Sequence, residues 1–333
     1  MSTAKPQPSG TVARLAPSPT GAQHLGNART FLLAWLSARS SQGRLLLRIE
    51  DIDSPRIKSW AIQQALDDLK WLGLDWDEGP DRPGPAGPYL QTERLGDYRS
   101  ALDDLRQREL IYPCTCTRSD VAEAASAPHW EHEGPVYPRT CTHRTVADSR
   151  SFQEVFAWRF RCLEGLWSFN DGYLGKQTCS VATELGDFIV AKKDGSPAYQ
   201  LAVVADDHAM QVTEVVRGDD LLASTFRQLQ LYSVFGWSTP RYYHLPLVVG
   251  PDGRRLAKRH GDSRLSHYRD LQVPPERVLG LLAHSIGLLP TCQACTASEL
   301  VDSFQWDRLS RQSCWQFTQD HESWLLGKAR QAF

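Results

Sequence analysis

The segment over residues 14–27, RLAPSPTGAQHLGN, has the composition and spacing of a phosphate-binding turn. Proline fixes φ and glycine accepts backbone conformations that other residues resist, so the segment favours a tight turn. A helical pattern follows, which would place His24 and Asn27 at a helix N-terminus, where unpaired N–H groups and the helix dipole favour an anion. Neither GxGxxG nor GxxxxGK[ST] occurs in this segment. We therefore expect a phosphate site of a different kind.

A second segment that could bind phosphate lies over residues 253–259, GRRLAKR, after an apolar run at 245–249. A glycine-containing loop with several arginines and a lysine could hold a polyphosphate through charge and hydrogen bonds. Taken alone, the same letters also fit an ordinary basic surface turn.

Three cysteines could form part of a metal site. Cys114 and Cys116 form a C-x-C pair, and Cys141 follows in the same region of the chain. Zinc takes four ligands, and a short loop with two thiolates is a usual half-site. On chemical grounds the fourth ligand could be a histidine. The histidines of this region are His129, His132 and His143.

Alternating strand and helix patterns surround the first of these segments. Apolar runs predict strands over residues 12–16 and 45–49, and helical spacing predicts helices over 26–41 and 59–72. This alternation indicates a Rossmann-type α/β fold, in which crossover helices join a parallel sheet. Ligands bind at the carboxyl ends of such strands. The phosphate-binding turn and the acidic segment 50–53 would therefore share one edge of the sheet.

The remainder of the chain departs from this pattern after a predicted helix over 93–109. Residues 111–185 are rich in Pro, His, Cys and Thr without a clear period, which indicates an insertion. Beyond it, apolar runs predict strands over 188–190, 199–205 and 212–216, and helices over 221–236 and 275–288. The predicted organisation is a disordered tail (1–10), two halves of a catalytic domain (11–110 and 186–250), the zinc-bearing insertion (111–185) and a basic loop with a small helical domain (251–333).

Composition places the chain among globular proteins, with 333 residues, 41% hydrophobic and 23% charged. No apolar run approaches the roughly 20 residues that span a bilayer, so no membrane partner is expected. The first ten residues carry no secretion signal, which favours a cytoplasmic location. The net charge of −2 neither supports nor excludes nucleic acid, because RNA binding needs only a local basic surface. We expect a monomer.

Several separated segments together resemble the glutamyl branch of the class I aminoacyl-tRNA synthetases. Residues 14–27 resemble the HIGH region of that class, and residues 255–259 resemble its KMSKS loop. The other matching segments are RIEDID at 48–53, Tyr199, VVADDH at 203–208 and VRGDDL at 216–221. Ala257 and Arg255 stand where Ser and Lys are usual, whereas Lys258 is kept. We expect this departure to slow activation without abolishing it.

The resemblance implies an ATP-dependent activation of L-glutamate, with Mg²⁺ carried by ATP. It implies ATP contacts at His24, Gly26, Asn27 and Lys258. It implies glutamate contacts at Arg14, Ser18, Glu50, Tyr199 and Arg217, an arginine-rich set that would favour glutamate over glutamine. Two structural alternatives remain open, since Arg217 could instead pair with Asp219 or Asp220, and Glu50 with Arg48 or Arg56. For the metal site the resemblance implies one structural zinc on Cys114, Cys116, Tyr137 and Cys141, with His143 as the alternative to Tyr137.

The acceptor is inferred from the end of the chain. About 70 residues follow the KMSKS-like loop, enough for a small helical bundle and too few for an anticodon-reading region. This organisation resembles the glutamyl-Q-tRNA(Asp) synthetases, which transfer glutamate to queuosine in the anticodon loop of tRNA(Asp). The insertion and the helical tail would then hold the tRNA loop. The alternatives are a minimal synthetase that acts at the tRNA 3′ end, a paralogue that binds tRNA or ATP without activity, and a nucleotidyltransferase that makes a small metabolite.

Overall fold

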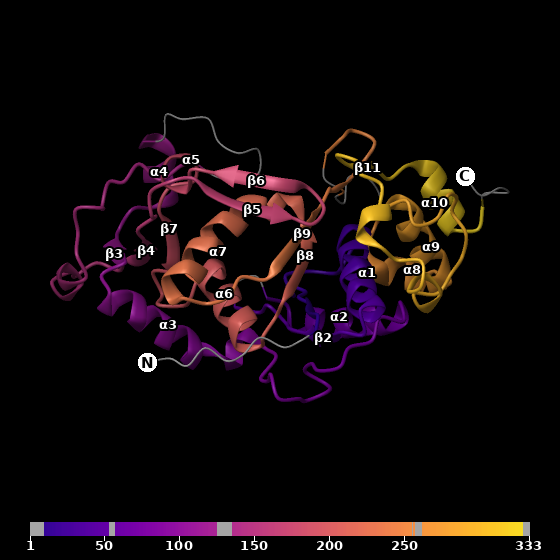
Figure 1. Ribbon diagram of the computed structural model, residues 1–333, viewed down its shortest axis with the longest axis horizontal. Coiled ribbons are helices and arrows are strands. Elements are labelled where there is room, and N and C mark those ends of the chain that lie inside the picture. Colours follow the sequence, from indigo (N-terminus) through magenta and orange to yellow (C-terminus); the bar gives the residue numbers. More distant parts are fainter. Residues whose placement is uncertain (1–9, 53–56, 125–134, 255, 257–261, 329–333) are drawn as a thin grey trace.

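A parallel sheet of four strands forms the centre of the protein. The computed structural model describes residues 10–52, 57–124, 135–254, 256 and 262–328. The sheet order is β2 (Arg44–Leu47), β1 (Val12–Leu15), β8 (Glu214–Gly218) and β9 (Arg241–Leu245), with every neighbouring pair parallel (Figure 1). Side chains on both faces of β1 are buried, as expected for a strand with helices above and below it. The predicted α/β fold with a parallel sheet is confirmed.

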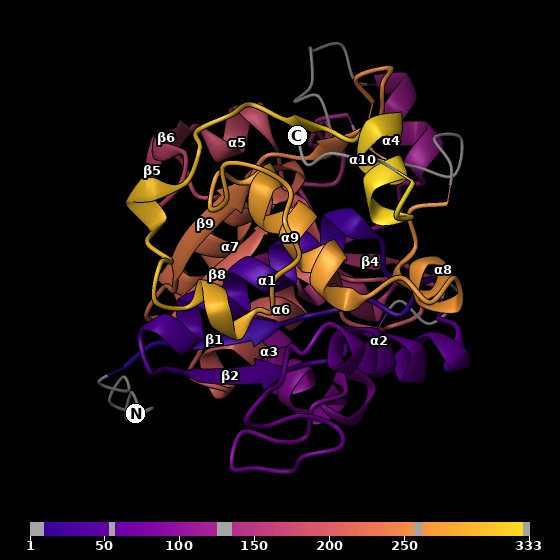
Figure 2. The ribbon, with the colours of Figure 1, turned by 90° about the vertical axis from the view of Figure 1, so that its right-hand side faces the viewer.

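Helix α1 (Leu25–Ser40) lies between the sheet and the C-terminal part of the chain (Figure 2). One side packs on β1 and β8, and another side packs on α9 (Pro275–Ser285). A helix enclosed in this way carries apolar residues all round, which explains the run of buried side chains from Phe31 to Ala38. Because β1 ends at Leu15 and α1 begins at Leu25, the turn between them lies at the carboxyl edge of the sheet.

The other helices of this part differ in how well the sequence predicted them. They are α2 (Ser59–Trp71), α3 (Leu95–Gln107), α6 (Tyr199–Ala209) and α7 (Leu222–Phe235). The helices predicted over 26–41, 59–72 and 221–236 are confirmed to within one residue at each end. Short 3₁₀ turns occupy Gln91–Glu93, Ala147–Arg150, Asp219–Leu221, Ser298–Leu300 and Trp306–Arg308.

The strand predicted over 199–205 was wrong, because these residues form the first turns of α6. Every residue from Leu201 to Asp207 is buried, so no polar face interrupts the apolar run. A short run buried on all sides shows neither the period of a strand nor that of a helix, and the two valines favoured the strand. Packing of this segment against α3 and α7 favours the helix.

The described part of residues 111–191, which includes the predicted insertion and the strand predicted over 188–190, contains regular structure of its own. Strands β3 (Ile111–Cys114), β4 (Ala157–Phe160) and β7 (Phe188–Ala191) form an antiparallel sheet, and β5 (Trp167–Asp171) pairs with β6 (Gly175–Cys179) as a hairpin. The two short helices are α4 (Arg118–Ala124) and α5 (Val181–Glu184). Strand β7 thus pairs with β4 and not with the parallel sheet.

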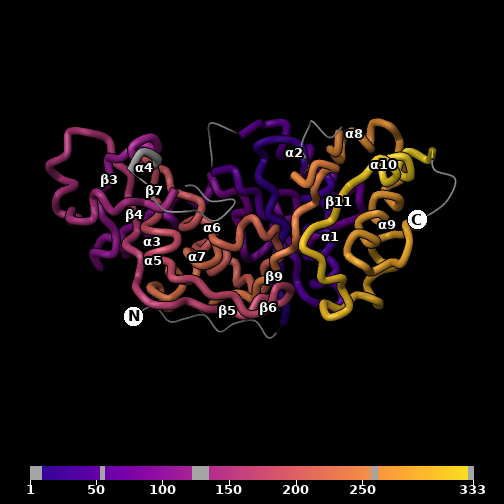
Figure 3. Tube along the Cα trace, turned by 90° about the horizontal axis from the view of Figure 1, so that it is seen from above, coloured from indigo at the N-terminus to yellow at the C-terminus, as the bar shows by residue number. Residues whose placement is uncertain are grey.

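Residues beyond 262 cover α1 at the opposite end of the molecule from β3, β4 and α4 (Figures 1 and 3). They comprise α8 (Leu265–Asp270), α9, α10 (Gln319–Leu325) and the two-residue strand β11 (Trp315–Gln316), which pairs with β10 (Val248–Val249). Their apolar side chains share one core with α1 and β1. Over the described ranges, no helix combines the length and the apolar character needed to cross a membrane.

Candidate active site

A cavity of about 680 Å³ opens at the carboxyl ends of β1 and β8, beside the first turn of α1. Arg14 comes from β1, Arg217 from β8 and Tyr199 from the start of α6. All predicted glutamate and ATP contacts except Lys258 line this cavity: Arg14, Ser18, His24, Gly26, Asn27, Glu50, Tyr199 and Arg217. Lys258 lies outside the described residues. The sheet edge predicted from the sequence therefore brings these side chains together.

Two buried guanidinium groups in the cavity wall keep unpaired N–H groups. Arg14 is 5% exposed, and its Nη1 donates to the carbonyl of Val216 at 3.3 Å, but its Nε has no hydrogen-bond partner. Arg217 is 4% exposed, and its Nη1 has no partner. An unpaired buried donor costs free energy, and an arginine in this state is suited to a carboxylate. The cavity thus has room for a small dicarboxylic ligand and two arginines in its wall.

Glu50 and Arg217 both bond to other side chains of the protein and also line the cavity. Glu50 Oε1 does pair with Arg48 Nη2 at 3.1 Å, and Glu50 still lines the cavity. Its pKa is raised because burial penalises the charged carboxylate more than the nearby guanidinium groups favour it. Arg56 lies outside the described residues. The Arg217 guanidinium bonds to side chains of α7 and β9.

Behind the cavity, Arg48 is completely buried and lies among three carboxylates. Its Nη1 bonds to Asp207 Oδ1 at 2.6 Å, its Nη2 to Glu50, and its Nε lies 3.7 Å from Asp206 Oδ2. Asp207 Oδ1 is also 3.7 Å from Arg14 Nε. Sequence analysis matched these aspartates to a family segment but assigned them no role. Their position at the end of a wholly apolar run could have indicated a role. Carboxylates at such a position are expected to be buried, and a buried carboxylate needs a charged or hydrogen-bonding partner.

His24 caps the N-terminus of α1. Its Nδ1 accepts the Gly26 N–H at 3.1 Å, and Asn27 Oδ1 accepts the His24 N–H at 3.3 Å. In the neutral imidazole this places the ring proton on Nε2. The Gly26 N–H, which the sequence directs toward phosphate, is thus bonded to His24. The segment after the KMSKS-like loop lies against the same turn, because Leu265 N donates to the Gln23 carbonyl at 2.9 Å.

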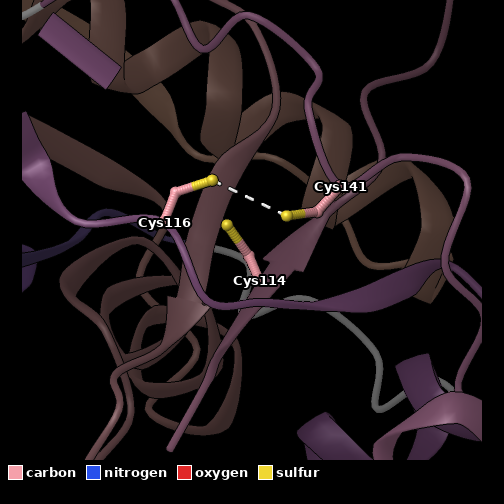
Figure 4. Close-up of side chains that lie close together, drawn as sticks. All are labelled: Cys114, Cys116 and Cys141. Carbon is pink, nitrogen blue, oxygen red and sulfur yellow. Dashed lines mark hydrogen bonds between the residues drawn. The ribbon is translucent and has the colours of Figure 1, made fainter. Parts of the chain in front are cut away.

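The predicted cysteine site is assembled at the end of β3 (Figure 4). The Sγ atoms of Cys114, Cys116 and Cys141 lie within 4.8 Å of one another, and those of Cys116 and Cys141 are 3.6 Å apart. The Tyr137 hydroxyl lies 3.4 Å from Cys114 Sγ and 3.6 Å from Cys116 Sγ, and it accepts the Cys141 N–H at 2.9 Å. Within the described residues, His143 does not join this cluster. Zinc takes four ligands in a tetrahedron and favours thiolates. Three cysteine sulfurs and a phenol oxygen this close together therefore fit zinc.

A family model described as tRNA synthetases class I (E and Q), catalytic domain, matches residues 11–323. The chain belongs to this family. The resemblance predicted from the HIGH-like and KMSKS-like segments is therefore confirmed, and the protein is a ligase of the class I synthetase type.

Several relatives are similar over most of their length. The glutamyl-Q tRNA(Asp) synthetase of Rhodopirellula baltica is 50% identical, with 91% of this chain and 96% of the relative covered. That of Symbiobacterium thermophilum is 48% identical, with 90% and 94% covered. Glutamate–tRNA ligase 2 of Syntrophus aciditrophicus is 39% identical, with 94% of this chain but 65% of the relative covered. Among solved structures, a glutamate tRNA ligase from Elizabethkingia meningosepticum in complex with its amino acid superposes with a TM-score of 0.80 at 27% identity, covering 95% of this chain and 68% of that one.

Proposed function

We propose that this protein activates L-glutamate with ATP and transfers it to queuosine in the anticodon loop of tRNA(Asp). The observation that supports glutamate most directly is the pair of buried arginines in the wall of one cavity, Arg14 and Arg217. Glutamate presents two carboxylates and one ammonium group. The two arginines would hold the carboxylates, and Glu50 would pair with the ammonium group. Tyr199 and Ser18 line the same cavity and would add hydrogen bonds.

The chemical step needs no nucleophile from the protein. An oxygen of the glutamate α-carboxylate attacks the α-phosphorus of ATP, a P–O bond forms, and the bond to the departing pyrophosphate breaks. Catalysis then depends on positioning and on cationic stabilisation of the phosphate charge. His24 and Asn27 stand at the N-terminus of α1 for this purpose, and Lys258 would approach from the KMSKS-like loop. Mg²⁺ would be held mainly by the phosphates of ATP.

In the second step, a hydroxyl of queuosine would attack the activated carbonyl and release AMP. The names and high identities of the glutamyl-Q relatives support this acceptor. The 39% identity with a glutamate–tRNA ligase supports an alternative acceptor, the 3′ end of a glutamate tRNA. The insertion and the helices beyond residue 262, which lie at opposite ends of the molecule (Figure 1), would hold the tRNA. We further propose that the protein acts in the cytoplasm as a monomer.

Two measurements test this function. Glutamate-dependent exchange of pyrophosphate into ATP, measured without tRNA, should be observed with the pure protein, and its absence would refute the activation step. Labelled glutamate should then be transferred to tRNA(Asp) that carries queuosine and not to tRNA(Asp) that lacks it. Equal labelling of the two tRNAs would refute the queuosine acceptor and favour the 3′ end.

We also propose one structural zinc on Cys114, Cys116, Tyr137 and Cys141. When bound, the ion would tie β3 to the loop that carries Tyr137 and Cys141. Replacing Cys116 by serine is expected to lower the zinc content of the purified protein from about one per chain to near zero, and to reduce transfer to tRNA more than pyrophosphate exchange. Mass spectrometry of bound metal and the two activity assays measure this.

The exposed Cys314 offers a control for the zinc variant. Cys314→Ser removes a thiol outside the cluster and should retain the metal and both activities. If Cys116→Ser retains its zinc, the cluster is not the metal site. If it loses zinc but transfers normally, the insertion does not hold the tRNA.

Gly26 should be sensitive to the addition of a single methyl group. An ideal Cβ at this position would lie 3.0 Å from His24 Cε1 and 3.1 Å from His24 Nδ1. Gly26→Ala should therefore displace the imidazole ring and raise the KM for ATP in pyrophosphate exchange by about 10-fold, which corresponds to about 1.4 kcal/mol. Gly21→Ala is the control, because nothing lies within 4 Å of a Cβ at Gly21 in the same turn. Equal KM values for the two variants would contradict this role of Gly26.

A further inference from the structure

Arg217 is held from behind by side chains that do not line the cavity. Its Nη2 donates to Gln228 Oε1 at 2.9 Å and to Thr225 Oγ1 at 2.5 Å, and its Nε donates to His244 Nε2 at 3.1 Å. Thr225 and Gln228 lie on α7, and His244 lies on β9, the neighbour of β8 in the sheet. Three bonds on two nitrogens leave Nη1 as the donor without a partner. The orientation of that donor is therefore set by groups outside the cavity.

His244 is completely buried, and its two ring nitrogens have different partners. Nδ1 lies 2.7 Å from Asp171 Oδ2, while Nε2 faces the Arg217 Nε–H and lies 2.8 Å from Thr225 Oγ1. Because a guanidinium group can only donate, Nε2 must be an acceptor. The ring proton then resides on Nδ1 and is donated to Asp171. Burial lowers the pKa of His244 to about 4, which keeps the ring neutral.

Asp171 ends strand β5 and ties the β5–β6 hairpin to β9. Its Oδ1 accepts the N–H groups of Tyr173 at 2.9 Å and Leu174 at 2.8 Å, and its two oxygens accept the His244 backbone N–H at 3.2 and 3.1 Å. Burial alone would raise the pKa of Asp171, but these bonds and that from the His244 ring keep it below the usual range. An ionised carboxylate that is fully buried and bonded on both oxygens is a rigid acceptor.

We propose that Asp171 and His244 are positioning residues for substrate carboxylate binding: Asp171 holds the Nδ1–H tautomer of His244, and His244 Nε2 fixes the Arg217 guanidinium in the cavity wall. This inference rests on the proposed function, in which Arg217 binds a glutamate carboxylate. Asp171 and His244 come from the hairpin and from β9, neither of which the sequence analysis connects with the substrate. Carboxylate control of an imidazole tautomer is a known means of orienting a functional group.

Substitutions at His244 and Asp171 distinguish the roles of the two ring nitrogens of His244. In His244→Asn the amide nitrogen can replace Nδ1 and keep the bond to Asp171, but nothing reaches Arg217. We expect the KM for glutamate in pyrophosphate exchange to rise about 10-fold, with the KM for ATP changed less than about twofold. His244→Gln can place an amide oxygen near the Nε2 position, and it should recover part of this loss. Asp171→Asn should behave like His244→Asn. The new amide N–H would donate to His244 Nδ1, so the ring proton would move to Nε2. There it would face the Arg217 Nε–H, and the bond between His244 and Arg217 would be lost.

Two further variants make the result decisive. His321→Asn replaces another buried histidine, which lies on α10 and away from the cavity. This variant should leave the KM values for glutamate and ATP unchanged. Its thermal unfolding measures the general loss of stability that such a substitution causes. Arg217→Lys tests the proposed function itself. If Arg217→Lys leaves the KM for glutamate unchanged, Arg217 is not a carboxylate ligand and the proposed site fails. If Arg217→Lys raises the KM for glutamate but His244→Asn and Asp171→Asn do not, the positioning role is overturned. It is also overturned if His244→Asn and Asp171→Asn raise the KM values for glutamate and ATP equally. Should His244→Asn fail to fold, His244→Gln and Asp171→Asn provide the same comparison.

Discussion

Replacing Arg14 by alanine is expected to cause the largest loss of glutamate activation. Arg14 is 5% exposed and carries an Nε–H without a hydrogen-bond partner in the wall of the cavity. Removing one partner of a buried, hydrogen-bonded charge pair costs about 2–5 kcal/mol, which lowers kcat/KM for glutamate roughly 30-fold to several-thousand-fold. Pyrophosphate exchange at varied glutamate and at varied ATP measures this effect. The loss should appear in the glutamate series.

Two variants define the cause of that loss. Arg14→Lys keeps a positive charge but loses the planar fork, so its activity should lie between those of the native protein and Arg14→Ala. Arg44→Ala, on the neighbouring strand β2, removes an arginine that pairs with Glu78 outside the cavity and should have little effect. Similar glutamate dependence in Arg14→Ala and Arg44→Ala would show that Arg14 does not bind the substrate.

Replacing Arg48 by methionine is expected to cause a large loss of stability. Arg48 is completely buried, and its guanidinium group contacts Glu50, Asp206 and Asp207. Its removal leaves buried carboxylates without their common counter-ion, and breaking a buried pair in this way costs about 3–5 kcal/mol. The midpoint of unfolding in urea should fall, with little change in the slope of the transition.

Arg39→Met is the matched control for Arg48. Arg39 lies on α1 and bonds to Asp75 and Asp77, but these carboxylates are far more exposed than those around Arg48. Surface pairs of this kind contribute about 0–1 kcal/mol. Equal destabilisation by the two substitutions would mean that the buried cluster has no special structural importance.

The sequence predicted the central features of the site because they are local. A buried strand, a proline- and glycine-rich turn and a helix start can be identified from neighbouring residues, and the structure places β1 and α1 as expected. Parallel strands align their carboxyl ends, so the turn at 14–27 and the segment at 50–53 were expected at one edge, and both contribute residues to the cavity wall. Their roles toward glutamate stay a prediction.

Other features required the folded chain. Residues 199–205 form a helix although their apolar run resembles a strand, because packing on all sides removes the polar face that would reveal the period. The pairing of β7 with β4 joins segments separated by the entire hairpin, and no local pattern selects that partner. Asp171 and His244 are 73 residues apart and meet only because the hairpin docks on β9.

The sequence by itself thus determined the family, the parallel sheet and the side chains offered to the ligands, since these depend on residue types at short spacing. Only the tertiary structure decided how those side chains are held. Arg48 is enclosed by carboxylates from α6 and from the segment after β2, Arg217 is oriented through His244, and three cysteines meet the Tyr137 hydroxyl. These contacts cross long stretches of chain, and their geometry arises from burial and packing.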